Sequence, residues 1–209
     1  MAEGAPGARC RLIPSFTSQT DSPPVGFARI LMPYPKQLLN ATGLARAVDR
    51  IAHEIAEKNL TGPDVAIVGI QRGGAHLSNR LKLALEKIWG HAVPYGLIDV
   101  SMHRDDHSHR LPQNIQPTNI PFDVTGKTVV LVDDVLFSGR TIRAALDAIT
   151  DLGRPKAIQL AVLIDRGNRE LPIKADFVGK ELATTLDERI DVRFKEDGAE
   201  NDSVELTKS

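Results

Sequence analysis

Two adjacent carboxylates, Asp133 and Asp134, end an apolar run and precede a loop of small and hydroxyl residues. That loop contains Ser138, Gly139 and Thr141, and it leads directly into a segment with helical spacing. Hydroxyls, accessible backbone amides and the dipole of a helix N-terminus all favour a bound anion. Neighbouring carboxylates repel each other, and solvent or a cation must offset that repulsion. The pattern therefore predicts a ligand with a phosphate at one end and hydroxyls or a metal-bound group beside it.

Helix capping is an alternative explanation for part of this pattern. Ser138 and Thr141 would then satisfy the first amides of the following helix, because capping and phosphate binding use the same groups. Capping does not account for the two neighbouring carboxylates, so we favour a functional interpretation for Asp133 and Asp134. For Arg140 alone, a solvated surface position is an equally good interpretation.

Strand and helix patterns alternate around this segment. Apolar runs predict strands at 65–70, 95–100, 128–132 and 158–164, and shorter ones near Phe177 and Val192. Apolar residues at helical spacing predict helices that include 44–55, 77–88 and 142–149. Such alternation predicts an α/β fold, with a mostly parallel sheet covered by helices on both faces. Ligands of these sheets bind beyond the carboxyl ends of the strands, which is where the two carboxylates lie.

The composition narrows the class of protein. The chain has 209 residues, 42% hydrophobic and 25% charged, with a formal net charge of −1 and one cysteine. This length suits one domain, and the apolar share suffices for a buried core, which excludes wholesale disorder. A single cysteine, Cys10, excludes a disulfide-stapled scaffold. The near-neutral charge argues against a general nucleic-acid coat, so RNA binding would need a local patch.

We expect three regions along the chain. Residues 1–35 are rich in Gly, Pro, Ser and Thr and predict a mobile leader, 36–195 predict the folded domain, and 196–209 predict a polar, loosely attached tail. No stretch approaches the roughly 18 consecutive apolar residues of a membrane helix. The N-terminus also lacks the basic-then-apolar pattern of a secretory signal. We therefore expect a cytoplasmic protein without membrane attachment.

One long run resembles the phosphoribosyl-pyrophosphate (PRPP) motif of type I phosphoribosyltransferases. Its residues are Val129, Val130, Leu131, Val132, Asp133, Asp134, Val135, Leu136, Phe137, Ser138, Gly139, Arg140 and Thr141. Further segments resemble the PyrR family, namely 50–54, 98–100 with 104–106, 160–167, 169–173 and 175–180. Members of that family combine uracil phosphoribosyltransferase activity with RNA-binding control of pyrimidine operons. The resemblance covers roughly residues 36 to 194 and implies the type I fold, a mostly parallel twisted sheet with a small hood and a flexible loop.

The resemblance implies the reaction of uracil with PRPP to give UMP and pyrophosphate. Residues 138–141 would hold the 5′-phosphate. Asp133 and Asp134 would lie under the ribose, hydrogen-bond its hydroxyls and stabilise the positive charge that develops on the ring. Mg²⁺ would arrive with PRPP, so we expect no dedicated cage of protein ligands. Arg104, in the run that corresponds to the family's flexible loop, would reach the pyrophosphate on closure, although His103 stands where a Tyr is usual.

A glycine-rich run after the first core strand would receive the pyrophosphate. It consists of Gln71, Arg72, Gly73 and Gly74, where the family more often has a Lys-Thr-Arg-Gly-like sequence. Glycines let the backbone approach an anion closely, and Arg72 adds a forked donor. A tight turn with one exposed arginine is the alternative.

Two further residues are implied for the nucleobase. Arg166 follows the last core strand and would border the base pocket, and a backbone amide near Ile190 would complete uracil recognition. The alternative for Arg166 is a surface salt bridge with Asp165 or Glu170. Because many enzymes share the PRPP motif, a purine-specific phosphoribosyltransferase is the alternative enzyme.

A basic stripe lies on the outer side of the first expected helix. Arg46, Arg50 and His53 are spaced i, i+4 and i+7, away from the apolar stripe. Such charges are usually just solvated. The resemblance implies instead that they bind the leader mRNA of a pyrimidine operon in a UMP-dependent manner, together with Arg169 and Lys174.

Two departures from the family pattern weaken the RNA interpretation. Asp49 replaces a typical Thr, and its carboxylate would repel phosphate, while Asn168 replaces a usual His. The second functional hypothesis is an RNA-binding attenuation regulator with vestigial catalysis. The resemblance also implies a homodimer or homotetramer.

Overall fold

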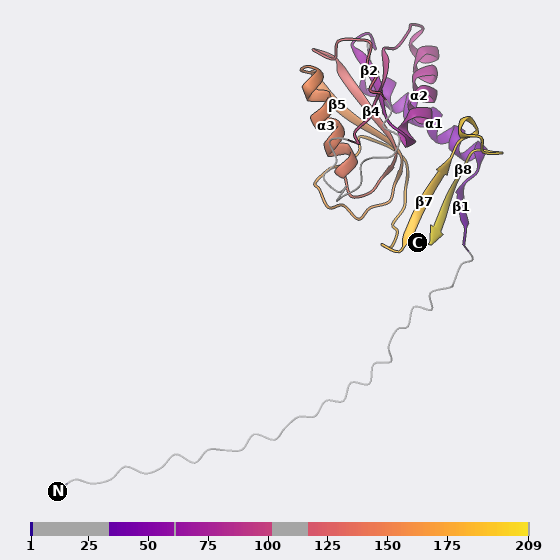
Figure 1. Cartoon of the computed structure of the whole chain (residues 1–209), viewed down its shortest axis with the longest axis vertical. Coiled ribbons are helices and arrows are strands. Elements are labelled where there is room, and N and C mark those ends of the chain that lie inside the picture. The colour runs from indigo at the N-terminus through magenta and orange to yellow at the C-terminus, as the bar shows by residue number, and fades with distance from the viewer. Residues whose placement is uncertain (2–33, 61, 102–116, 209) are drawn as a thin grey trace. The chain divides into compact units, whose positions relative to one another are not determined.

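The computed structural model describes residue 1 and residues 34–60, 62–101 and 117–208. Within these residues, five strands form a parallel sheet in the order β3-β2-β4-β5-β6 (Figure 1). Their bounds are Val65–Ile70 for β2, Tyr95–Ile98 for β3, Thr128–Leu136 for β4, Ala157–Asp165 for β5 and Phe177–Glu181 for β6. Every neighbouring pair is parallel. The predicted α/β fold with a mostly parallel sheet is confirmed.

Helices cover both faces of this sheet. In the described part of the chain they are α1 (Ala41–Lys58), α2 (Gly73–Trp89) and α3 (Arg140–Leu152). Figure 1 shows α3 on one side of the sheet and α1 and α2 on the other. The side chain of Asn40 caps α1 by accepting a hydrogen bond from Gly43 N at 2.9 Å, and Gly90 ends α2 in the left-handed conformation.

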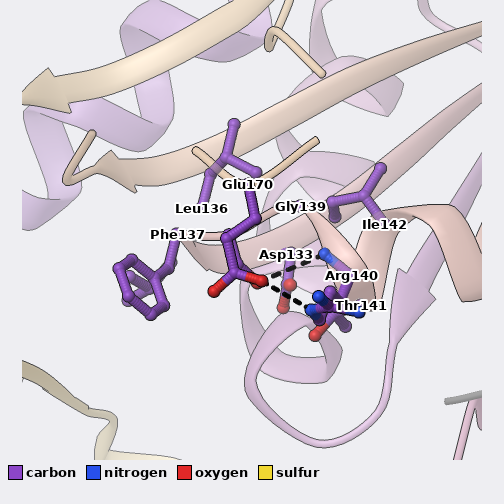
Figure 2. A pocket seen from close by; sticks show the side chains of 10 residues that line it. Asp133, Leu136, Phe137, Gly139, Arg140, Thr141, Ile142 and Glu170 are labelled. Carbon is purple, nitrogen blue, oxygen red and sulfur yellow. Dashed lines mark hydrogen bonds and ion pairs between the residues drawn. The ribbon is translucent and has the colours of Figure 1, made fainter. Parts of the chain in front are cut away.

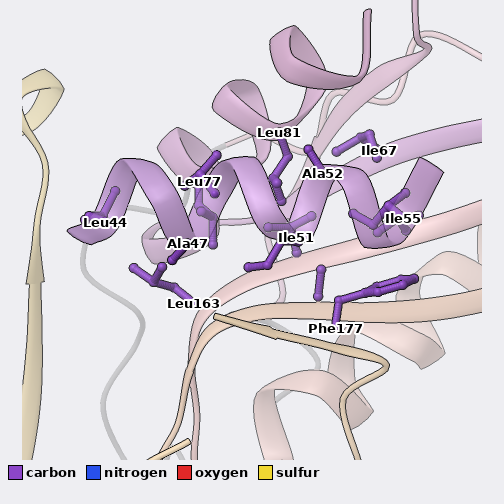
Figure 3. Close-up of a cluster of buried hydrophobic side chains, with 14 of the residues drawn as sticks. Leu44, Ala47, Ile51, Ala52, Ile55, Ile67, Leu77, Leu81, Leu163 and Phe177 are labelled. Atoms are coloured by element: carbon purple, nitrogen blue, oxygen red, sulfur yellow. The ribbon is translucent and has the colours of Figure 1, made fainter. Parts of the chain in front are cut away.

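The strands supply both apolar cores by alternation. Val130 and Val132 of β4 pack toward α1 and α2, whereas Val129 and Leu131 pack toward α3, and all four are fully buried. Figure 3 shows the first of these cores, where apolar side chains of α1 and α2 meet those of the sheet. A strand that is buried on both faces needs apolar residues at every position. The first part of β4 was therefore easy to predict, because it is a continuous apolar run.

A second, antiparallel sheet of the described residues has the order β1-β8-β7. Its strands are β1 (Lys36–Leu39), β8 (Ser203–Lys208) and β7 (Glu188–Arg193), and a 3-10 helix, η1 (Lys195–Asp197), follows β7. Ile190, Val204 and Leu206 of this sheet belong to the same core cluster as α1 and α2. This sheet corresponds to the small hood that the family resemblance implies.

The expectation of a loosely attached tail from residue 196 is wrong. β8 pairs with both β1 and β7, and Val204 is fully buried. The sequence signal was a short alternation of polar and apolar residues between charged ends, which is weaker than the continuous runs of the main sheet. The expected leader lies almost wholly outside the described residues, as does Cys10, and stays a prediction.

Leu206 provides a test of how much β8 contributes to the domain. Leu206→Ala should lower the free energy of unfolding by about 2–4 kcal/mol, because it removes a buried side chain from the core shared with α1. Urea unfolding followed by circular dichroism measures this change. Lys208→Ala, at an exposed position of the same strand, should change stability little. Equal stability of both variants would contradict an integral β8.

No helix in the described residues is both long enough and apolar enough to cross a lipid bilayer.

Candidate active site

β4 extends four residues beyond the predicted strand and carries both carboxylates. Asp133 pairs with Val162 of β5, and the pairing continues to Leu136 opposite Asp165. Because side chains alternate along a strand, Asp133 and Asp134 point to opposite sides of the sheet edge. The two carboxylates therefore lie next to two different regions, the start of α3 and the start of α2.

Asp133 faces the start of α3. Its side chain lines a pocket there and is buried, and its Oδ1 accepts a hydrogen bond from Asp134 N at 3.0 Å. This places one carboxylate beside the segment expected to bind phosphate.

Asp134 faces the start of α2 instead. A Cβ built on Gly73 would lie 2.3 Å from Asp134 Cγ and 2.4 Å from both carboxylate oxygens, so a side chain at that position would force the carboxylate to move. Oδ1 accepts a hydrogen bond from Val135 N at 2.8 Å. Burial raises the pKa of Asp134 above its ordinary value, and the nearby charge of Asp197 raises it further. The second carboxylate thus contacts the loop expected to receive pyrophosphate.

The phosphate loop, which we define as residues 137–141, surrounds a pocket of about 320 Å³ (Figure 2). Gly139 precedes α3 with a φ of 92°, a conformation that favours glycine, and it has no side chain to cap the helix. Ser138 Oγ accepts a hydrogen bond from Arg140 N at 3.3 Å, so part of the capping interpretation holds. α3 begins Arg-Thr-Ile-Arg without an acidic residue, which leaves its positive end suited to an anion.

Glu170 is a pocket residue whose place in the site the sequence did not reveal. It lines the same pocket, and Arg140 Nε donates a hydrogen bond to its Oε2 at 2.7 Å (Figure 2). In the sequence it was considered only as a partner of Arg166. Its position depends on how the chain folds back toward α3 after β5, and no local sequence pattern predicts that path.

The loop at 71–74 lies at the carboxyl end of β2, beside β4. Gln71 N donates to Ile98 O at 2.8 Å, its side chain donates to Pro117 O at 3.2 Å, and the peptide between Gln71 and Arg72 is cis. A Cβ on Gly74 would lie 2.2 Å from Val132 O, so the helix start packs directly on β4. The loop is therefore adjacent to the carboxylates, at the carboxyl ends of the two paired strands.

Arg166 is buried rather than part of a surface salt bridge. Its guanidinium lies 4.3 Å from the Phe137 ring centroid and donates to Thr184 Oγ1 at 2.9 Å. It also donates to the carbonyls of Thr185 and Glu188. Arg166 thus joins the phosphate loop to the turn before β7.

Ile190 lies inside β7, and its side chain packs in the core. The roles of Arg166 and of the backbone near Ile190 in binding a base stay predictions.

The predicted RNA-binding residues fall into two groups. Arg46, His53 and Lys174 are exposed. Arg50 instead donates to Val178 O at 3.0 Å and to Gly179 O along the edge strand β6, and it pairs with Glu54. The guanidinium of Arg169 is bound by carbonyls of its own chain. His53 Nδ1 also lies 2.7 Å from Asp49 O, so three of the five residues have hydrogen-bond partners within the protein.

His103 and Arg104 lie outside the described residues, so the role of Arg104 stays a prediction.

Comparison with known proteins identifies the family. The phosphoribosyl transferase domain model matches residues 35–194. The bifunctional protein PyrR of Roseiflexus sp. (strain RS-1) is 60% identical over 162 residues, which cover 77% of this chain and 88% of that protein. The PyrR of Listeria welshimeri is 47% identical over 176 residues, which cover 82% and 96% of the two chains.

Solved structures agree with the fold. The hypoxanthine phosphoribosyltransferase of Trypanosoma cruzi superposes with a TM-score of 0.63, covering 83% of this chain and 96% of that one. At 15% identity, this likeness shows the fold alone. From the domain match and the identity to PyrR proteins over most of its length, the chain belongs to the phosphoribosyltransferase family and, within it, to the bifunctional PyrR proteins.

Proposed function

We propose that this chain converts uracil and PRPP into UMP and pyrophosphate at the carboxyl end of β4, and that it also binds leader mRNA of pyrimidine genes in a UMP-dependent manner. Membership in the PyrR family supports both activities. The observation that carries the catalytic part is the pocket at the start of α3, with Asp133 in its wall and Asp134 on the adjacent side of the strand.

The geometry suggests how PRPP lies in the site. The 5′-phosphate would occupy the phosphate loop, and the pyrophosphate would lie toward the loop at 71–74. The ribose between them would pass over the end of β4, where Asp133 and Asp134 point to either side. Carboxylates placed there would stabilise the positive charge that the ribose ring gains as pyrophosphate leaves.

Mg²⁺ suits this site because carboxylate and PRPP oxygens are the hard ligands it prefers. Among the described residues, no three His, Cys, Asp or Glu side chains are placed to hold one metal ion. We propose that PRPP oxygens and water hold most of its coordination sphere. The ion would neutralise charge on the pyrophosphate.

The direct test is UMP formation by the purified chain from uracil and PRPP with Mg²⁺. Parallel reactions with hypoxanthine decide between a pyrimidine and a purine enzyme. We expect turnover with uracil only. Turnover with hypoxanthine and none with uracil would establish the purine alternative.

Thr141 tests the phosphate loop itself. Thr141→Ala should raise the KM for PRPP about tenfold and leave kcat within about twofold, because a hydrogen bond to a charged phosphate contributes about 1.5–3 kcal/mol. Steady-state kinetics measure both constants. Thr150→Ala, at an exposed position of the same helix, is the control. An unchanged KM for PRPP would contradict a role of Thr141 in binding the phosphate.

The exposed cations of α1 motivate the RNA test. Arg46 and His53 face outward on this helix, with the exposed Asp49 between them. A gel shift with pyrimidine leader RNA, with and without UMP, separates a regulator from a plain enzyme. RNA binding without turnover would establish the regulator with vestigial catalysis. We also propose a homodimer or homotetramer, which light scattering measures.

A further inference from the structure

A support segment, which we define as residues 166–173, follows β5 and folds back under the phosphate loop. Gly167 and Asn168 adopt successive positive φ angles of 72° and 55°, and these reverse the chain. Asparagine tolerates that conformation better than most residues, and Asn168 Nδ2 donates to Thr184 O at 2.8 Å. The reversal directs the next side chain, Arg169, back toward the end of β4.

Every nitrogen of the Arg169 guanidinium donates to the protein. Nη1 donates to Phe137 O at 2.8 Å, to Gly167 O at 3.0 Å and to Leu136 O at 3.3 Å. Nε donates to Ile173 O at 3.0 Å, and Nη2 pairs with Asp165. The side chain is 21% exposed. Because its donors are occupied by these acceptors, Arg169 is poorly suited to hold an RNA phosphate.

Backbone contacts complete the support. Glu170 N and Leu171 N both donate to Ser138 O at 3.0 Å. A Cβ on Gly139 would contact Leu171 and Ile173 at 3.3–3.4 Å, so the segment packs closely against the loop. Arg169 thus binds the last two carbonyls before Ser138, and its neighbours bind the carbonyl of Ser138 itself.

We propose that Arg169 is a positioning residue for the 5′-phosphate loop, and that it acts on PRPP and UMP by fixing the backbone of residues 136–138. It touches neither ligand. A loop already held in its binding conformation loses less entropy when it binds a ligand, so the consequence falls mainly on affinity. This inference rests on the proposed phosphoribosyltransferase function, and it replaces the expected RNA contact of Arg169.

Two substitutions at the same position test this role. Arg169→Met removes every donor, and we expect the KM for PRPP and the Kd for UMP to rise at least tenfold while kcat falls less than threefold. Arg169→Lys retains one charged donor and should recover part of the loss, to within about threefold of the parent. Arg154→Met, which removes an exposed arginine beyond the end of α3, is the matched control and should leave all three constants unchanged.

The same variants distinguish positioning from RNA contact. Loss of RNA binding by folded Arg169→Met, with a KM for PRPP within twofold of the parent, would overturn the proposal in favour of an RNA contact. If Arg169→Met does not fold, Arg169→Lys decides: an unchanged KM for PRPP in that variant also overturns it. Absence of turnover and of UMP binding in the parent protein would instead refute the proposed function.

Discussion

Asp134→Asn should lower kcat for UMP formation about 100- to 1,000-fold while changing the KM for PRPP much less. The carboxylate stabilises positive charge on the ribose, and that charge develops only in the transition state. Asparagine has nearly the same shape, and its Oδ1 can still accept the hydrogen bond from Val135 N. Steady-state kinetics with varied PRPP separate the two constants. Equal losses in kcat and PRPP affinity would contradict charge stabilisation.

The same substitution should stabilise the fold at neutral pH. Burial raises the pKa of Asp134 in the folded chain, so keeping this carboxylate ionised at neutral pH weakens the fold. The contribution of this group to stability is complete below its unfolded pKa, near 3.8, and is lost as pH rises through the raised folded value. Asp134→Asn avoids that loss.

Urea unfolding of the ligand-free proteins at several pH values checks this expectation. The variant should exceed the parent at pH 8, and the difference should shrink toward pH 4. Asp147→Asn, at an exposed position of α3, is the control. A parent protein more stable than Asp134→Asn at pH 8 would show that the buried carboxylate does not weaken the fold. Together with the kinetics, the expected result would show that the Asp134 carboxylate increases the rate of the reaction and lowers the stability of the fold.

The strands of the main sheet could be predicted because both of their faces are buried. β2 formed with the predicted bounds, Val65–Ile70, as a continuous apolar run. β4 is longer than predicted because Asp133 and Asp134 interrupt its apolar pattern, yet the strand still pairs with β5 from Asp133 to Leu136. β8 was missed because only Val204 and Leu206 mark its buried face. Exposed and functional positions weaken the hydrophobic signal on which such predictions depend.

In the candidate site, too, some residues could be predicted from the sequence and others could not. The carboxylates and the phosphate loop are contiguous in sequence, so their proximity followed from local pattern. Glu170 and Arg169 reach that loop from about 30 residues further along the chain, through a reversal at two residues with positive φ. Arg50 likewise looked like a free surface charge, although it binds carbonyls of β6. For such residues, tertiary contacts decide between a solvated, a structural and a functional role.

Gly74→Ala should destabilise the protein and lower its activity strongly. The new Cβ would lie 2.2 Å from Val132 O and 3.1 Å from Asp133 Cα, and backbone atoms of a central strand cannot move aside like a flexible side chain. α2 must then shift away from β4, at a cost of about 1–3 kcal/mol or more. The shift also displaces the loop at 71–74 from Asp134, and a misplacement of about 1 Å can cost about 100-fold in rate.

Helix propensity and the contact with β4 predict opposite changes in stability for Gly74→Ala. Alanine is favoured over glycine inside helices by about 0.5–1 kcal/mol, so propensity alone predicts a gain in stability. Gly43→Ala, in the first turn of α1, is the matched control, because its Cβ would meet only side-chain atoms of Asn40 and Leu39 at 3.3 Å or more. Unfolding curves and kcat/KM of both variants should show loss for Gly74→Ala and near-parent values for Gly43→Ala. A gain in stability for both would mean that α2 does not press on β4, and the link between the pyrophosphate loop and the catalytic carboxylates would lose its physical basis.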